Sequence, residues 1–211
     1  RRYSNMRRVA GEVDEEEGRQ ELFHTNQFLV ATSFDEARAA TIGAELQHYL
    51  EWKDTVPLSL DEVQKQLGKS QLSSQEKLVA GMLSKSNLLD IVRHFVVFMD
   101  IDGRTIKIAP RYQQFRAVQF SIDRLRSGKT RLQDGEFDRR GGLVWHTQGS
   151  GKSLTMVFLV RKMRSTPELR RFKVVVVTDR KDLQRQLSAT AKLTGQNVHV
   201  GDSVNEGKRY L

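Results

Sequence analysis

The sequence contains no cysteine and only three prolines among its 211 residues. It also lacks any apolar run approaching the ~20 residues that a membrane-spanning helix needs. The absence of cysteine excludes a disulfide scaffold, a thiolate metal site and a cysteine nucleophile. It is consistent with a reducing compartment, so we expect a cytoplasmic protein without a membrane partner.

Charge is unevenly distributed along the chain. The sequence carries 35 Lys and Arg against 26 Asp and Glu, a net charge of +9. Residues 1–100 hold 12 basic and 16 acidic side chains, whereas residues 101–211 hold 23 basic and 10 acidic ones, a net charge of +13. A basic half favours contact with nucleic-acid backbone or nucleotide phosphate. The alternative is a set of helix faces that are merely solvated. The acidic run 14–17 has no histidine nearby and predicts a solvated loop or linker.

Local patterns before residue 110 predict mixed helices and strands. Ser59 and Glu62 have the spacing of a capping box and predict a helix over 60–67. Ser73 or Ser74, with Glu76, predicts a second cap before 77–83. The other elements expected are a helix end and charged linker in 1–20, a buried strand at 28–32, a strand at 37–42, a helix at 88–94, and a hairpin of 96–101 and 105–108 around Asp102-Gly103.

After residue 110 the order of the patterns indicates a parallel sheet. Pro110 begins an amphipathic helix that extends to about Leu125, and a polar loop over 127–140 follows. A strand at 143–145, a helix at 152–164, a buried strand at 173–178 and a helix at 180–193 complete the pattern. This βαβα order predicts a parallel sheet with right-handed crossovers.

A glycine-rich loop gives the strongest functional signal in the sequence. Residues 146–153 read His-Thr-Gln-Gly-Ser-Gly-Lys-Ser, which departs from a complete P-loop only at His146. Gly149 and Gly151 permit backbone N–H groups to turn toward an oxyanion, and Ser150 lies between them. Lys152 would reach the β- and γ-phosphates of ATP, and the Ser153 hydroxyl would be a ligand of Mg²⁺. A flexible Gly-Ser turn is the alternative interpretation.

Other residues in the chain give weaker chemical signals. Asp179 ends an apolar run but is followed by Arg180, so we do not assign it as the Mg²⁺ carboxylate of the motor. We expect the loop formed by Thr178, Asp179 and Arg180 to lie near DNA instead. The five histidines have no metal-ligand spacing, and His146 is expected only to shape the loop.

The segment Gly141–Met156 resembles the motor region of type I restriction endonuclease R subunits, which are similar to superfamily 2 helicases. The resemblance extends over most of the chain, including 173–187 and 110–118. It implies that Gln114, or alternatively Gln113, reads the adenine of ATP, because an amide can pair with adenine N6 and N7. It also implies a PD-(D/E)xK nuclease fold before the motor. Tyr3 would be the tyrosine of the Gln-x-x-x-Tyr motif that lies late in that nuclease fold.

The domain organisation follows from this resemblance. Residue 1 is not methionine and no signal segment follows, so we expect an internal fragment of a longer protein. The fold class is α/β: the end of a nuclease domain and a linker in 1–20, an α+β connector in 21–108, and the first half of a RecA-like ATPase domain in 109–211.

The function implied is that of the subunit that translocates and cleaves double-stranded DNA in a type I restriction-modification enzyme, with ATP and Mg²⁺ as cofactors. Its partners would be the methyltransferase and specificity subunits, and the fragment alone should be inactive. A different class of function is a nucleotide-binding regulatory or DNA-binding module that does not hydrolyse ATP. A small P-loop kinase is less consistent, because no segment resembles a lid or acceptor site.

Overall fold

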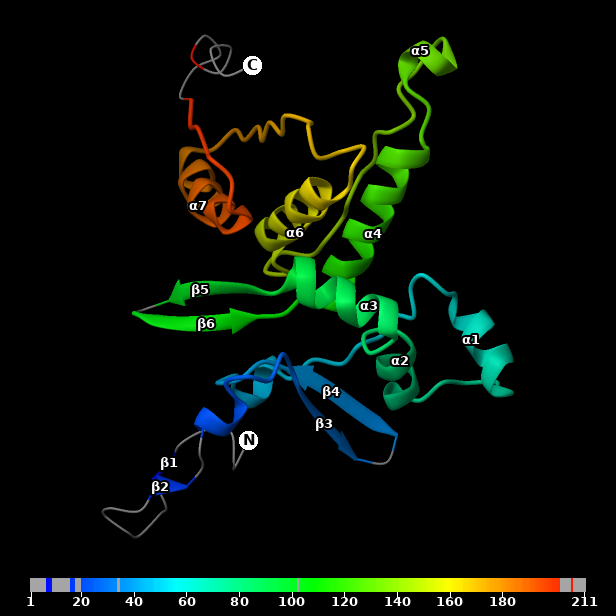
Figure 1. Ribbon diagram of the computed structural model, residues 1–211, viewed down its shortest axis with the longest axis vertical. Coiled ribbons are helices and arrows are strands. Elements are labelled where there is room, and N and C mark those ends of the chain that lie inside the picture. Colours follow the sequence, from blue (N-terminus) through cyan, green and yellow to red (C-terminus); the bar gives the residue numbers. More distant parts are fainter. Residues whose placement is uncertain are drawn as a thin grey trace. The chain divides into compact units, whose positions relative to one another are not determined.

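The computed structural model describes residues 7–8, 16–17, 20–33, 35–101, 103–201 and 206 of the chain (Figure 1). The backbone divides into two units, Arg1–Tyr112 and Gln113–Leu211. The domain boundary expected from the sequence after residue 108 stays a prediction. Tyr3 lies outside the described residues, so its proposed place in a nuclease motif stays a prediction.

Among its described residues, unit 1 contains three antiparallel strand pairs: β1 (Arg7–Arg8) with β2 (Glu16–Glu17), β3 (Leu29–Ser33) with β4 (Glu36–Ala40), and β5 (Val97–Ile101) with β6 (Arg104–Ile108). The hairpin predicted from 96–101 and 105–108 is confirmed as β5 and β6, and the strands expected at 28–32 and 37–42 form close to those positions as β3 and β4. Two expectations were wrong, because Glu16 and Glu17 form a strand and not a loop, and because β3 is largely exposed. A two-stranded hairpin has no second layer to cover both of its faces, which explains the exposure of β3.

The helices described in unit 1 are η1 (Gln20–Phe23), η2 (Leu46–His48), α1 (Leu60–Leu67), α2 (Ser74–Ala80), α3 (Lys85–Asp90) and the π-helical turn η3 (Ile91–Phe95). Helix α1 begins where its capping residues predict, whereas α2 and α3 each begin three residues before the start expected from the sequence. Ser59 and Glu62 form a complete capping box at α1, and Ser73, not Ser74, forms one with Glu76 at α2. These bonds satisfy backbone N–H groups that a helix start otherwise leaves unpaired.

The core of unit 1 lies under these helices and is made of Trp52, Leu78, Met82, Ile91 and Phe95, each at most 4% exposed. Gly81 follows α2 directly against this core. A Cβ added at Gly81 would collide with the Asp54 carbonyl and the Trp52 ring, so this close approach requires glycine. Asn87 is buried beside it and donates hydrogen bonds to Val56 O and Gly81 O at 2.6 and 2.7 Å.

The regular elements among the described residues of unit 2 are helices: α4 (Tyr112–Ser127), α5 (Arg131–Asp134), α6 (Lys152–Ser165), α7 (Lys181–Ala191) and η4 (Lys192–Thr194). The amphipathic helix expected after Pro110 is confirmed as α4, whose apolar residues Phe115, Val118 and Ile122 are buried. Helix α6 lies beside α4 (Figure 1). Lys162 Nζ of α6 donates to Gln119 Oε1 of α4 at 2.7 Å and so joins the two helices.

The parallel sheet predicted for unit 2 does not form among the residues that the structure describes. Residues 143–145 and 173–178 carry no strand. Leu143 is 87% exposed and Val177 is 89% exposed, so the expectation of a buried strand at 173–178 was wrong. A strand needs a neighbour for its backbone hydrogen bonds. These two apolar segments do not pair with each other, so neither forms a strand.

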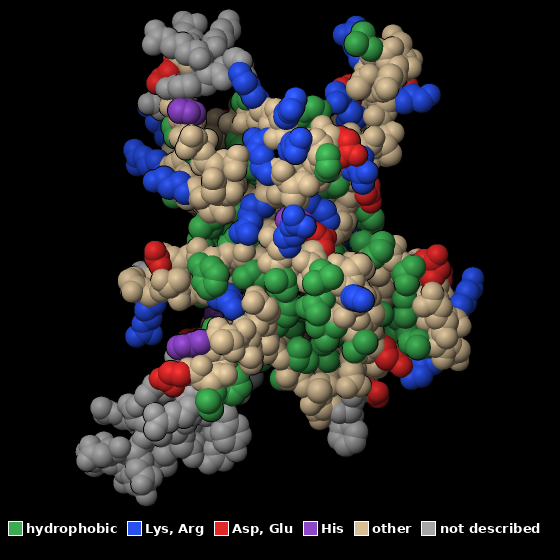
Figure 2. All heavy atoms as spheres, viewed as in Figure 1, with side chains coloured by type: hydrophobic (Ala, Val, Ile, Leu, Met, Phe, Trp, Pro, Cys, Tyr) green, Lys and Arg blue, Asp and Glu red, His purple; other side chains and the backbone are tan. Residues whose placement is uncertain are grey.

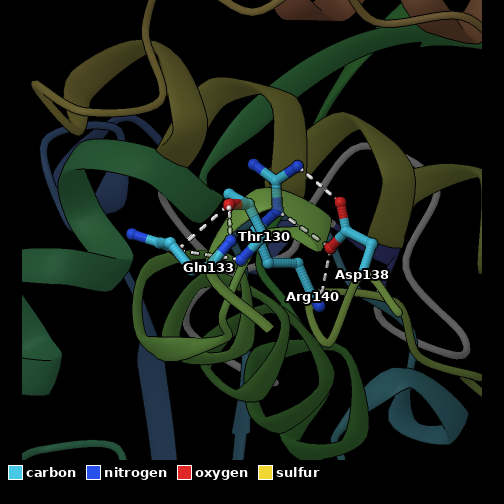
Figure 3. A network of polar contacts seen from close by, with 4 residues as sticks. All are labelled: Thr130, Gln133, Asp138 and Arg140. Atoms are coloured by element: carbon cyan, nitrogen blue, oxygen red, sulfur yellow. Dashed lines mark hydrogen bonds and ion pairs between the residues drawn. The ribbon is translucent and has the colours of Figure 1, made fainter. Parts of the chain in front are cut away.

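The segment between α4 and residue 141 contains a short helix and several side-chain hydrogen bonds, whereas the sequence predicted only a polar loop. Thr130 caps the short helix α5 and forms a capping box with Gln133 (Figure 3). The Arg140 guanidinium donates to both Asp138 carboxylate oxygens, at 3.0 and 2.6 Å. Hydrogen bonding from the Arg140 side chain lowers the pKa of Asp138 to about 2. Leu132, in α5, is 98% exposed.

Candidate phosphate-binding site

The glycine-rich loop leads directly into the N-terminus of α6. Gly149 and Gly151 both have left-handed backbone angles, with φ of +74° and +82°. L-residues with a side chain rarely adopt such angles, so the sequence places glycine where the loop turns. Ser150 lies between the two glycines, and both its backbone N–H and its hydroxyl donate to Thr147 O, at 3.4 and 2.7 Å. The loop is therefore closed upon itself.

Lys152, the first residue of α6, extends its side chain back over this loop. Its ammonium group donates to His146 O and Thr147 O, both at 2.7 Å, while the residue as a whole is exposed. Two carbonyl oxygens thus hold the positive charge inside the curve of the loop. Phosphate oxygens could take the place of these carbonyl oxygens and would bring a full negative charge to the ammonium.

The start of α6 adds a second anion-binding feature. The first intrahelical bond runs from Thr155 N to Gly151 O at 3.1 Å. By helix geometry, the N–H groups of Lys152, Ser153 and Leu154 precede it and have no intrahelical acceptor. These groups carry the positive end of the helix dipole. Ser153 lies in this first turn and is partly exposed, so a metal ion bound beside phosphate could reach its hydroxyl.

Gln114 reaches the same loop from α4. Its side-chain Nε2 donates to Ser150 O at 3.3 Å and to Gly151 O at 3.0 Å, and the residue is only 3% exposed. Gln113, the other glutamine considered for adenine, is partly exposed. The structure therefore brings Gln114 together with Ser150 and Gly151. A sequence signal for this burial exists, because Gln114 is four residues before Val118 and shares the buried face of α4.

The residues expected near DNA lie apart from the loop in sequence, immediately before α7. Arg180 is the N-cap residue of α7, and its backbone N–H donates to Thr178 Oγ1 at 3.4 Å. Asp179 and Arg180 are exposed. Figure 2 shows Lys and Arg side chains spread over the helices of unit 2 on the face drawn, as the charge of the sequence predicts. The contact of these residues with DNA stays a prediction.

The titratable residues of the described part do not form a metal-binding cluster. No group of three or more His, Asp or Glu residues there could hold a metal ion. His146 is partly buried beside the loop, and its Nδ1 is buried without a hydrogen-bond partner among the described residues. Within the same part of the chain, no helix combines the length and apolarity that crossing a membrane requires.

Comparison with known proteins gives results that agree with the loop geometry. A family model described as SWI2/SNF2 ATPase matches residues 113–209, which coincide almost entirely with unit 2. The match includes the glycine-rich loop and α6. No solved structure matches the chain significantly.

Several curated proteins are similar in sequence. The chain is 37% identical over 194 residues to the type I restriction enzyme HindI endonuclease subunit of Haemophilus influenzae, an alignment that covers 88% of this chain and 18% of that protein. It is 36% identical over 115 residues to the putative type I restriction enzyme MjaIXP endonuclease subunit of Methanocaldococcus jannaschii, covering 54% of this chain and 10% of that protein. The chain therefore spans less than a fifth of the length of these two relatives.

Proposed function

We propose that this chain, which is homologous to type I restriction enzyme endonuclease subunits and carries a SWI2/SNF2 ATPase-like region, binds ATP with Mg²⁺ at the loop 149–153. The observation that carries the proposal is the Lys152 ammonium held within a glycine loop at the start of α6. Backbone N–H groups, a lysine and a helix N-terminus together form a site for phosphate groups.

Each residue of the loop has a defined task in this proposal. Gly149, Ser150 and Gly151 bind phosphate oxygens through their backbone N–H groups. Lys152 leaves the carbonyls of His146 and Thr147 and neutralises the β- and γ-phosphates. The Ser153 hydroxyl is a ligand of Mg²⁺. When bound, Mg²⁺ would offset negative charge on the phosphates during hydrolysis. An amide of Gln113 or Gln114 is proposed to read adenine.

The motor would act on double-stranded DNA. The net charge of +13 on residues 101–211 supports binding to the phosphate backbone, and the exposed Arg180 beside Thr178 and Asp179 is a proposed contact. We propose that residues 109–211 belong to a RecA-like domain. Residues 21–108 would be the connector to a nuclease domain, and residues 1–20 with Tyr3 the end of that domain.

The names of the relatives support a broader proposal. Type I restriction enzyme endonuclease subunits are homologous over most of this chain, so we propose ATP-driven translocation and cleavage of DNA as the activity in which it takes part. The partners proposed are the methyltransferase and specificity subunits of the restriction complex. The 211-residue chain alone should bind nucleotide and hydrolyse it negligibly.

The test is the affinity of the purified chain for ATP, measured by calorimetry. Lys152→Ala should weaken binding by about tenfold or more, because a hydrogen bond to a charged group contributes about 1.5–3 kcal/mol. Lys192→Ala removes an equal charge from an exposed position in η4 and serves as the matched control. Equal effects of both substitutions would show that the loop does not bind phosphate.

A second measurement separates the proposal from the alternative of a non-hydrolysing module. ATP turnover should be measured in the homologous full-length enzyme with DNA present. Turnover that depends on Lys152 supports a motor, whereas tight ATP binding with no turnover under any condition would favour the regulatory module.

A further inference from the structure

We infer that unit 2 carries a second binding site for the phosphate backbone of duplex DNA, formed where α4 and α6 end and by the turn 166–172 after α6. The inference goes beyond the contact proposed at 178–180, and it rests on the proposal that the chain acts on DNA. Five arginines form this site, which we call the far-end surface: Arg124 and Arg126 of α4, Arg164 of α6, and Arg170 and Arg171 of the turn.

The far-end surface lies at the opposite end of α6 from the phosphate loop. The loop leads into the first turn of α6, whereas Arg164 belongs to the last turn. A helix of 14 residues is about 21 Å long, since each residue adds about 1.5 Å. An anion bound by these arginines is therefore a different one from the phosphates bound at the loop.

The helix dipoles explain only a small part of the positive charge at this end. Residues 119–127 and 159–173 carry eight basic and two acidic side chains, a net charge of +6. Basic residues at a helix C-terminus offset the helix dipole, which is equivalent to about half a negative charge. Two helix ends therefore account for about one positive charge. The excess favours an external polyanion.

The Arg164 side chain holds the turn 166–172 in place. Its guanidinium donates to Arg170 O and Phe172 O, at 2.8 and 2.7 Å. It also donates to Gln196 Oε1 at 3.1 Å. These three acceptors are neutral oxygens, so the bonds orient the guanidinium without cancelling its charge.

The backbone of the turn is closed by its own hydrogen bonds. The N–H groups of Leu169 and Arg170 donate to Thr166 O, at 3.0 and 2.9 Å. The Leu169 side chain is 2% exposed and anchors the turn in unit 2. Arg170 and Arg171 are exposed on this supported backbone. Because the backbone is ordered before binding, these arginines lose less entropy when they contact a ligand.

The end of α4 brings further arginines to the same surface. Arg126 of α4 donates to the Glu168 carboxylate of the turn at 3.4 Å, which places these two elements side by side. The two side chains are 51% and 58% exposed. An ion pair this exposed contributes little to stability, so a phosphate oxygen can replace Glu168 at Arg126. Arg124 is exposed in the same last turn of α4.

The residue types of the two segments favour nucleic-acid phosphate as the ligand. Six of the eight basic residues are arginine, whose planar guanidinium pairs with phosphate through two hydrogen bonds. Duplex DNA carries one negative charge per about 1.7 Å of its axis, so it presents several phosphates to arginines of different elements. Contacts with phosphate carry no sequence information, so binding should not depend on base sequence.

The test is fluorescence anisotropy of the 211-residue chain with a short labelled duplex over a series of salt concentrations. Arg170→Gln together with Arg171→Gln should weaken binding at low salt about tenfold or more and lower the slope of log K against log salt by about two units, one per lost phosphate contact. Arg38→Gln together with Arg104→Gln removes two exposed arginines from unit 1 and is the matched control. The control should leave both quantities unchanged.

A second variant should increase affinity, which a folding defect would not do. Glu168→Gln removes the carboxylate beside Arg126, so binding at low salt should strengthen about threefold or more and the slope should rise by about one unit. Glu21→Gln removes an exposed carboxylate from η1 and is the control for this substitution.

The outcomes separate this inference from the proposed function. Loss of binding in the Arg170 and Arg171 double variant, with Arg180→Ala unaffected, supports the far-end surface and removes the contact at 178–180. The reverse result overturns the far-end surface. Equal affinity for poly-glutamate would assign the surface to an acidic protein and also overturn the inference. Absence of DNA affinity at low salt would do the same, while calorimetry with ATP tests the nucleotide site independently.

Discussion

Replacing Gly151 by alanine should damage unit 2 in two ways that the structure separates. The left-handed backbone at φ +82° costs an L-residue about 1–2 kcal/mol. The new Cβ would also lie 2.5 Å from Gln114 Nε2. The amide must then move and give up bonds to two carbonyls, each contributing about 0.5–1.5 kcal/mol. Together these effects should lower the stability around the loop by about 2–5 kcal/mol.

Gly149→Ala is the matched control for the backbone effect. Gly149 has a similar φ of +74°, but no described atom lies within 4 Å of where its Cβ would be. This substitution should therefore cost only the conformational penalty of about 1–2 kcal/mol. The difference between the two variants, about 1–3 kcal/mol, measures the contact with Gln114.

Native-state hydrogen exchange of α6 amides is the suitable assay, because α6 begins at this loop. Tryptophan fluorescence would report poorly on unit 2, since Trp145 is 85% exposed and its surroundings change little on unfolding. Trp52, which is 4% exposed in unit 1, serves instead as a check that this other unit stays folded.

A double-mutant cycle completes the experiment. In a Gln114→Ala background the Cβ of residue 151 meets no amide, so Gly151→Ala and Gly149→Ala should cost the same. Equal costs already in the wild-type background would refute the reasoning, because the contact with Gln114 would then contribute nothing.

Two further predictions concern the charged surface. Binding of the chain to DNA should weaken with salt by roughly one unit of log K per unit of log salt for each phosphate contacted. Arg180→Ala should reduce that slope, whereas Lys65→Ala on α1 should not, and a salt-independent affinity would contradict the proposed DNA contact. An NMR titration should place the pKa of Asp138 at about 2, below its ordinary value of 3.8, and Arg140→Gln should raise it again. Because folding lowers this pKa, the contribution of the pair to stability is present above pH 3.8 and is lost as the pH falls through about 2. A titration midpoint near 3.8 in the unsubstituted chain would show that the pair does not form in solution.

Sequence reasoning succeeded where structure depends on neighbours a few residues apart. The capping boxes at Ser59 and Ser73 and the β5–β6 hairpin formed as predicted, because their hydrogen bonds join residues close in the chain. The glycine-rich loop also leads into the helix α6, as expected, although the strand expected before it at 143–145 does not form. The short helix α5 was not predicted, because four residues are too few to show the apolar periodicity of a helix.

Apolar patterning misled the prediction of strands in unit 2. Val174–Val177 has the composition of a buried strand, yet Val177 is 89% exposed. Composition indicates that a segment can form a strand, whereas the hydrogen bonds that make it one must come from a partner strand. The described residues of unit 2 do not supply that partner.

The sequence by itself determined the local elements of this protein and the residue types at the phosphate loop. Gly149, Gly151 and Lys152 could be identified from the sequence, because their spacing is typical of a loop that binds phosphate. Only the tertiary structure decided that Gln114 contacts this loop. The loop that it contacts lies 36 residues further along the chain, and a contact across that distance depends on how α4 packs and not on any local pattern.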